Sequence, residues 1–232
     1  MSTHIFIKRV NNQTLTLRQW IFISCCFSIL LVGVRVLVTG YITYLFLIWN
    51  LFLAFIPYAI SEWFSSKITV IESRIKRVAT LAVWLLFIPN SFYIITDLYH
   101  LVQFDSAPKW FDLLMVFSFA WNGLLFGVLS VRKIKLIVTL ISGWSLSLFF
   151  IAAVMWLNAF GIYVGRILRF NSWDIIVQPF SLVDDILYIL CHPIRNKMEW
   201  GMITTWAVFM TLFYITIEKL GESFLPRHSS KN

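Results

Sequence analysis

Charged residues are scarce in this chain, and their scarcity excludes an ordinary soluble domain. Only 13% of the 232 residues are Asp, Glu, Lys or Arg, whereas a soluble domain has about a quarter. Hydrophobic residues make up 59% of the chain and fall in long runs. We therefore expect an integral membrane protein of one domain, with the lipid bilayer as its main partner.

Cysteine and the familiar catalytic motifs are also scarce or missing. The three cysteines comprise the adjacent Cys25 and Cys26 and the distant Cys191, a spacing that gives neither a disulfide framework nor a metal site. There is no serine elbow, P-loop or zinc-helix motif, so the sequence identifies no metal and leaves any cofactor unknown. The net charge of +8 suggests no nucleic-acid partner, because the basic residues lie between apolar runs without a nucleic-acid motif.

Six apolar runs are long enough to cross a bilayer, which requires roughly 20 residues. They lie at 20–38, 42–61, 78–96, 111–131, 136–157 and 200–217. This pattern predicts an all-α bundle of six transmembrane helices. Residues 20–218 then form the single membrane domain, with cytoplasmic segments at 1–19 and 219–232.

Lysines and arginines gather on one side of these runs, which predicts the orientation. By the positive-inside rule, both termini are cytoplasmic. The thirteen basic residues on this side are Lys8, Arg9, Arg18, Lys67, Arg74, Lys76, Arg77, Arg132, Lys133, Lys135, Lys219, Arg227 and Lys231. The outer side has five, which are Lys109, Arg166, Arg169, Arg195 and Lys197. Arg35 lies near the outer end of the first run and is expected to reach the interface.

The outer segment 158–199 is unlike an ordinary loop. It contains the run 180–191, which is apolar except for Asp184 and Asp185. Twelve residues are too few to span a bilayer, so the run predicts an interfacial or re-entrant helix.

A polar stripe in the third run is the strongest indication of a site. Asn90, Tyr93, Asp97 and His100 recur at i, i+3, i+7 and i+10, which places them on one side of a helix. Ionisable groups in a membrane usually face a bundle interior or a watery cavity. Pro89 interrupts the helix beside the stripe, and the resulting kink either shapes packing or opens a cavity.

Further polar groups lie along the fourth run, from its outer end at Asp112 to Asn122 near the midplane, and beyond the outer end of the fifth run. Those considered with the stripe as ligand-binding candidates are Asp112, Asn122, Arg166, Arg169, Asn171 and Asp174. The expected pocket opens outward between the third, fourth and fifth helices, with 158–199 as its lid. The alternatives are an amide hydrogen bond between helices for Asn90 and Asn122 and snorkelling to lipid phosphates for the two arginines. Packing suffices to explain Asn50 in the second run. Gly161 and Gly165 form a small-xxx-small pair that permits close helix approach.

Asp97 and His100 are spaced to form an acid–base pair. A carboxylate at i−3 orients an imidazole and raises its basicity, which suits general base catalysis. A metal-dependent form would add a ligand such as Asp112, Asp174 or His192.

Three blocks of sequence resemble a known family. They are FIPNSFYIITDLYHL at 87–101, WFDLLMVFSFAWNG at 110–123 and GIYVGRILRFNSWD at 161–174. Over roughly residues 45–215 the chain resembles the bacterial multi-pass membrane family called domain of unknown function 1361. Ser91-Phe92 stands where Ala-Pro is expected, and Phe111 stands where Tyr is common. The resemblance implies a bacterial cytoplasmic membrane and no particular activity.

Three functions fit these observations. The first is binding or transport of a small anion or lipid headgroup held by Arg166 and Arg169. The second is an enzyme acting on a cell-envelope or lipid substrate, with Asp97 and His100 as its acid–base pair. The third is a structural or accessory role in which the polar residues only join helices. The sequence identifies no protein partner.

Overall fold

The computed structural model describes residues 15–102, 107–170 and 177–223, and within these ranges it contains helices and no strand. The helices are α2 (Leu17–Thr39), α3 (Phe46–Ser65), α4 (Ile68–Glu72), α5 (Arg74–Tyr93), α6 (Lys109–Ser142), α7 (Trp144–Arg166), α9 (Pro179–Cys191) and α10 (Lys197–Ser223), with a 3₁₀ helix, η1 (Ile94–Val102), continuing α5. The predicted all-α fold is confirmed.

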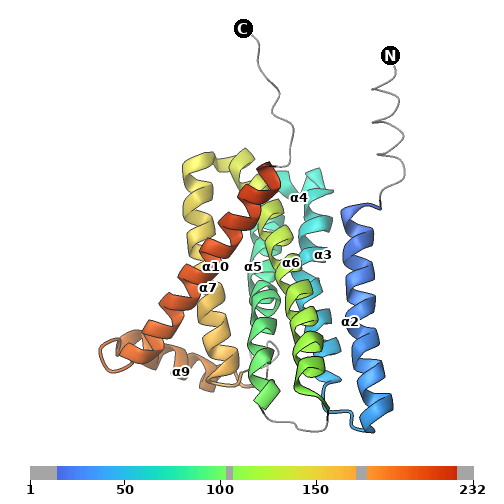
Figure 1. Cartoon of the computed structure of the whole chain (residues 1–232). Coiled ribbons are helices and arrows are strands. Elements are labelled where there is room, and N and C mark those ends of the chain that lie inside the picture. Colours follow the sequence, from blue (N-terminus) through green and yellow to red (C-terminus); the bar gives the residue numbers. More distant parts are fainter. Residues whose placement is uncertain (1–14, 103–106, 171–176, 224–232) are drawn as a thin grey trace, which may run out of the picture.

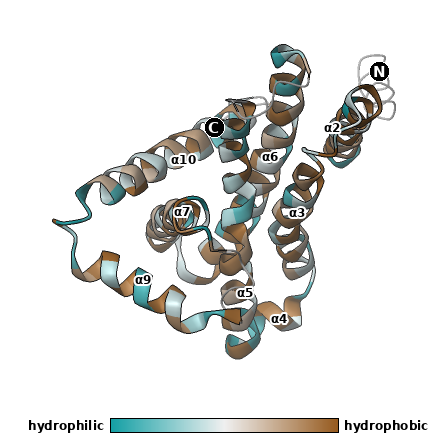
Figure 2. Cartoon of the chain, turned by 90° about the horizontal axis from the view of Figure 1, so that it is seen from below, coloured by the Kyte–Doolittle hydropathy of each residue, from teal (hydrophilic) through white to brown (hydrophobic). Residues whose placement is uncertain are grey.

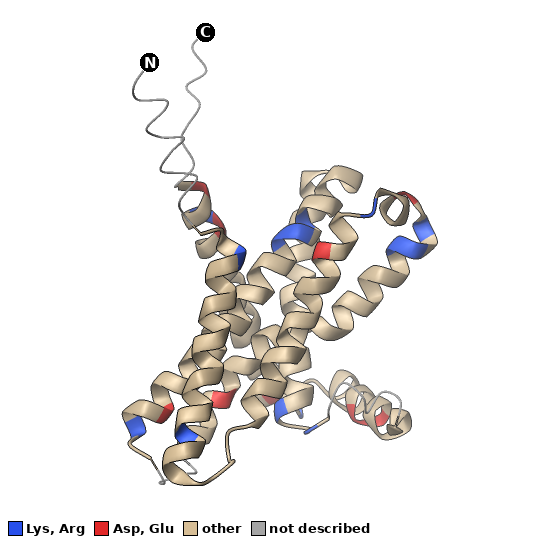
Figure 3. Cartoon of the chain, turned by 90° about the vertical axis from the view of Figure 1, so that its right-hand side faces the viewer, with Lys and Arg blue, Asp and Glu red and all other residues tan. Residues whose placement is uncertain are grey.

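The arrangement of helices and charges is that of a membrane bundle. Within the part of the chain that the structure describes, five segments are long and apolar enough to cross a bilayer, namely α2, α3, α5 with most of η1, α7 and α10. The helix α6 packs among them and contacts α2, α3, α5 and α7 (Figure 1). Lys, Arg, Asp and Glu gather toward the two ends of the bundle and leave the middle almost free of charge (Figure 3). The total of six spans stays a prediction, with α6 as the sixth.

The boundary between the fourth and fifth predicted helices was wrong. We expected one helix to end at 131 and the next to begin at 136, but α6 continues through Arg132, Lys133 and Lys135 to Ser142. Arg and Lys are good helix formers, so these residues do not end a helix. The chain turns instead at Gly143, whose φ of 84° favours glycine.

The two ends of the bundle differ. The start of α2 and the end of α10 lie at the same end, while α9 lies across the opposite end (Figure 1). Viewed from that end, α9 is at the periphery beside α7, and α2 is on the far side (Figure 2). Leu182 and Ile189 of α9 are buried, whereas Asp184 and Asp185 are exposed. A short helix is thus present in the predicted segment, but residues 158–166 belong to α7 rather than to a lid.

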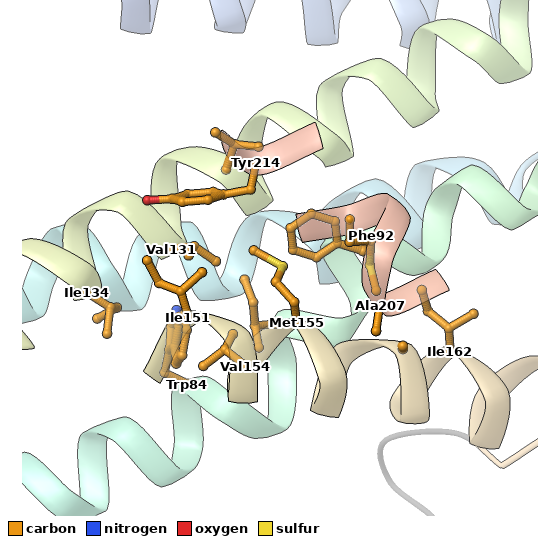
Figure 4. Close-up of a cluster of buried hydrophobic side chains, with 14 of the residues drawn as sticks. Trp84, Phe92, Val131, Ile134, Ile151, Val154, Met155, Ile162, Ala207 and Tyr214 are labelled. Carbon is orange, nitrogen blue, oxygen red and sulfur yellow. The ribbon is translucent and has the colours of Figure 1, made fainter. Parts of the chain in front are cut away.

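Helix packing combines an apolar core with hydrogen bonds between helices. The larger core cluster joins α5, α6, α7 and α10 around residues such as Trp84, Met155 and Tyr214 (Figure 4). Trp84 Nε1 donates to Ser130 Oγ at 2.7 Å, and Ser130 donates to the Pro57 carbonyl at 2.8 Å. Because lipid provides no hydrophobic drive between helices, close packing and such bonds hold α3, α5 and α6 together.

Candidate ligand-binding site

A cavity of about 370 Å³ lies between α3, α5, η1, α7 and α9. Its polar lining consists of Asn50, Asn90, Tyr93, Asp97, His100 and Arg166. Five of these six are residues that the sequence singled out as site candidates. The structure therefore brings the whole polar stripe together with one of the two predicted arginines.

Two local features present the stripe to the cavity. The chain changes from α-helix to 3₁₀ helix after Tyr93, so the stripe does not lie on one continuous α-helix as expected. A 3₁₀ helix has three residues per turn, which aligns Asp97 with His100. On the facing helix, a Cβ built on Gly161 would lie 2.8 Å from Pro89 Cβ, and one on Gly165 would lie 3.2 Å from the Tyr93 ring. Close approach at the small-xxx-small pair thus places α7, and Arg166 with it, beside the stripe.

Arg166 joins the two titratable groups of the stripe. Its Nη1 is 3.9 Å from Asp97 Oδ1 and 3.2 Å from His100 Nε2. Arginine has no acceptor, so Nε2 of His100 must accept, which fits a neutral imidazole protonated at Nδ1. The guanidinium also lies 5.5 Å from the centre of the Tyr99 ring. Arg166 is therefore close to both members of the predicted acid–base pair.

Asp97 is held by a partner that the sequence analysis missed. Its side chain is 1% exposed, and Oδ2 accepts a hydrogen bond of 2.8 Å from Asn50 Nδ2 on α3. The assignment of Asn50 to packing is therefore incomplete. The available signal was that a polar side chain in a membrane helix needs a partner, although its identity could not be deduced from the sequence.

A protein-family model covers the part of the chain that contains this cavity. The model of the family described as "Protein of unknown function (DUF1361)" matches residues 49–216. The chain belongs to the DUF1361 family. No curated protein and no solved structure matches it. The DUF1361 match includes all six polar residues of the cavity and begins after α2.

Asp112 and Asn122 lie elsewhere in this DUF1361 protein. Asp112 accepts hydrogen bonds from Arg35, with Nε–Oδ1 at 2.7 Å and Nη2–Oδ2 at 3.1 Å. Asn122 Nδ2 donates to Ser28 Oγ at 2.9 Å. Both contacts join α6 to α2, and no described residue lining the cavity belongs to α6. The expectation that the fourth helix lines the pocket was therefore wrong, as was that of a snorkelling Arg35, which is 1% exposed.

The remaining candidates do not add to the described cavity. Arg169 follows the end of α7 with a φ of 61°, is exposed, and is not among the described lining residues. Asn171 and Asp174 lie outside the described residues. Within the described ranges there is no group of three His, Cys, Asp or Glu able to hold a metal. His192 Nδ1 lies 3.0 Å from the Tyr188 carbonyl of its own helix.

Proposed function

We propose that the protein binds an anionic group, a phosphate or carboxylate of a lipid headgroup or small anion, in this cavity through Arg166. The supporting observation is that the guanidinium is accessible from the cavity and is not within hydrogen-bond distance of Asp97. The Arg166 side chain is 18% exposed and lines the cavity, and its 3.9 Å separation from Asp97 is longer than a hydrogen bond. A guanidinium presents a planar fork of donors that suits phosphate and carboxylate. Arg166 therefore has the chemistry and the access to bind an anion.

The contrast between this cavity and the other polar contacts argues against a purely structural role. Arg35 and Asp112 form a closely packed pair, exposed by 1% and 0% respectively. The groups around Arg166 instead border about 370 Å³ of open space, which is within the range of small-molecule sites. Polar residues that only join helices have no need of such a space.

The distribution of charge supports an outward-facing cavity. The cavity's polar end lies where α7 ends, which is the bundle end opposite the start of α2 and the end of α10 (Figure 1). The described basic residues toward the α2 start are Arg18, Lys67, Arg74, Lys76, Arg77, Arg132, Lys133, Lys135 and Lys219. By the positive-inside rule that end is cytoplasmic, so the cavity faces outward in a bacterial cytoplasmic membrane.

A second candidate is an enzyme acting on a lipid or cell-envelope substrate. It draws on the fact that Asp97 and His100 line the same cavity as Arg166. In that case Arg166 would hold the anionic group of the substrate, and Asp97 and His100 would exchange a proton with it.

Substitutions at Arg166 and His100 distinguish these functions. We expect Arg166→Ala to weaken binding of phosphatidic acid to the detergent-purified protein by roughly 10- to 100-fold, because charge-assisted hydrogen bonds are lost. His100→Gln should retain binding, since the Gln oxygen still accepts from Arg166. Asp97→Asn should tighten binding, because it removes the negative charge 3.9 Å from Arg166 Nη1. Binding isotherms for the four proteins provide the measurement.

Arg169→Ala is the matched control, because it removes an exposed arginine near the same helix end but outside the described cavity lining. An equal loss of binding in Arg169→Ala and Arg166→Ala would show surface charge attraction and contradict the proposal. A lower melting temperature in each of Asp97→Asn, His100→Gln and Arg166→Ala would favour the structural role. Loss of turnover of a lipid substrate in Asp97→Asn, with binding retained, would favour the enzyme.

A further inference from the structure

We infer that the ligand of this cavity is a membrane lipid that inserts one hydrocarbon chain alongside its anionic headgroup. This inference rests on the proposed function and specifies its ligand class. Three observations support it: the change in polarity along the cavity, the exposure of its apolar residues, and the positive charge of Arg166 at its polar end.

The cavity changes from polar to apolar along its length. Asp97, His100 and Arg166 lie at the end nearest α9, beside the apolar Leu182 and Ile186 of that helix, with Asn50 and Asn90 next. Beyond these amides the lining consists of apolar residues on three helices, which include Leu53, Leu85, Leu86 and Phe160. Leu86 lies about 18 Å from Asp97 along the axis, from the rise per residue of α- and 3₁₀ helices. A free anion occupies only the polar end, whereas a headgroup with a chain matches both parts.

The apolar part of the cavity reaches the lipid-facing surface. Trp49 on α3 and Leu86 on α5 both line the cavity, yet they are 51% and 41% exposed. Both helices are segments able to cross a bilayer. Apolar surface exposed on a membrane span faces lipid chains rather than water. A chain can therefore reach the cavity from the bilayer at exposed Leu86 of α5, past Trp49 of α3.

The charge at the polar end of the cavity specifies the headgroup. The guanidinium of Arg166 selects an anionic headgroup, which makes an anionic phospholipid of the leaflet on the α9 side the expected occupant.

Filling the apolar end tests the chain separately from the headgroup. We expect Leu86→Trp to weaken binding of dioleoyl phosphatidic acid to the full-length protein in detergent at least tenfold. Binding of glycerol 3-phosphate, which is the same headgroup without chains, should not change and should be weaker than that of the lipid in the parent protein. Val83→Trp is the control, because Val83 is 49% exposed on the same helix and is not among the described lining residues. Leu53→Phe fills the same end of the cavity from α3. It provides the test if Leu86→Trp has a lower melting temperature than the parent protein.

Each outcome has one meaning. Weaker lipid binding in Leu86→Trp and Leu53→Phe but not in Val83→Trp supports the inference. Unchanged lipid binding in the two filling variants, with loss of binding in Arg166→Ala, overturns the inference that a hydrocarbon chain binds in the cavity and leaves only the anion site. Equal affinity of the parent protein for glycerol 3-phosphate and the lipid would also overturn the inference of a bound chain and leave only the anion site. Absence of binding of both probes to the parent protein overturns the inference and the proposed function together.

Discussion

Replacing Asp112 with alanine is expected to lower the free energy of unfolding by about 3–5 kcal/mol, the cost of breaking a buried ion pair. Arg35 binds this carboxylate through two hydrogen bonds of 2.7 and 3.1 Å, and the two side chains are 1% and 0% exposed. The guanidinium also lies 4.4 Å from the centre of the Tyr44 ring, which fixes its position. Alanine would remove the carboxylate, whereas the positive charge of Arg35 would remain buried. Thermal unfolding in detergent should show a loss on the order of 10 °C for a chain of this size.

Two comparisons test whether the buried charge of Arg35 causes the loss of stability in Asp112→Ala. Arg18→Ala breaks the pair with Glu62, in which the Arg18 side chain is 73% exposed, and should cost no more than about 1 kcal/mol. The double variant Arg35→Leu with Asp112→Leu should recover most of the lost stability, because replacing both partners with apolar residues removes the unbalanced charge. Equal destabilisation by Asp112→Ala and Arg18→Ala would show that the Arg35–Asp112 pair contributes little.

This pair also explains how α2 is held in the bundle. The match to the DUF1361 family begins at residue 49, after α2 ends at Thr39. Two buried polar contacts join α2 to α6, from Arg35 to Asp112 and from Asn122 to Ser28. Together with the second apolar cluster, which includes Val32, they attach a helix outside the matched region to the centre of the matched domain.

Hydropathy predicted the helical fold because the membrane constrains the backbone. A chain in lipid must satisfy its backbone hydrogen bonds internally, so long apolar runs become helices. The polar stripe was predictable for a similar reason, since residues on one side of a helix are close whatever the rest of the fold does. Asn90, Asp97 and His100 accordingly line one cavity.

The partners across helices could not be deduced in the same way. Arg35, Asp112 and Asn50 are polar residues in or beside apolar runs, and their pairing depends on which faces meet when the helices pack. By sequence, Asp97, Asp112 and Asp174 are all possible carboxylate partners of Arg166. The structure places Asp97 beside it and Asp112 against Arg35. Lys135 of α6 likewise has a distant partner, because it is buried and binds Glu218 of α10 at 2.7 Å.

Replacing Gly161 with valine should reduce both stability and ligand binding. A Cβ at this position would lie 2.8 Å from Pro89 Cβ and 2.9 Å from Pro89 Cγ, and a proline ring cannot rotate away. The helices α5 and α7 must therefore separate, at a cost of about 1–3 kcal/mol for overpacking. Because Gly161 lines the cavity, separation also moves Arg166 away from Asp97 and His100. Thermal unfolding and phosphatidic acid binding measure the two effects.

Gly201→Val is the matched control for this change. Gly201 lies in α10, and no other atom within 4 Å would meet a Cβ built there. The control carries the same change in helix propensity without the collision with Pro89, so it should melt close to the parent protein and bind lipid normally. Equal losses in the two variants would attribute the effect to valine in a helix and contradict a role for the contact between Gly161 and Pro89. A loss of binding in Gly161→Val alone would show that close approach of α5 and α7 positions Arg166 for its ligand.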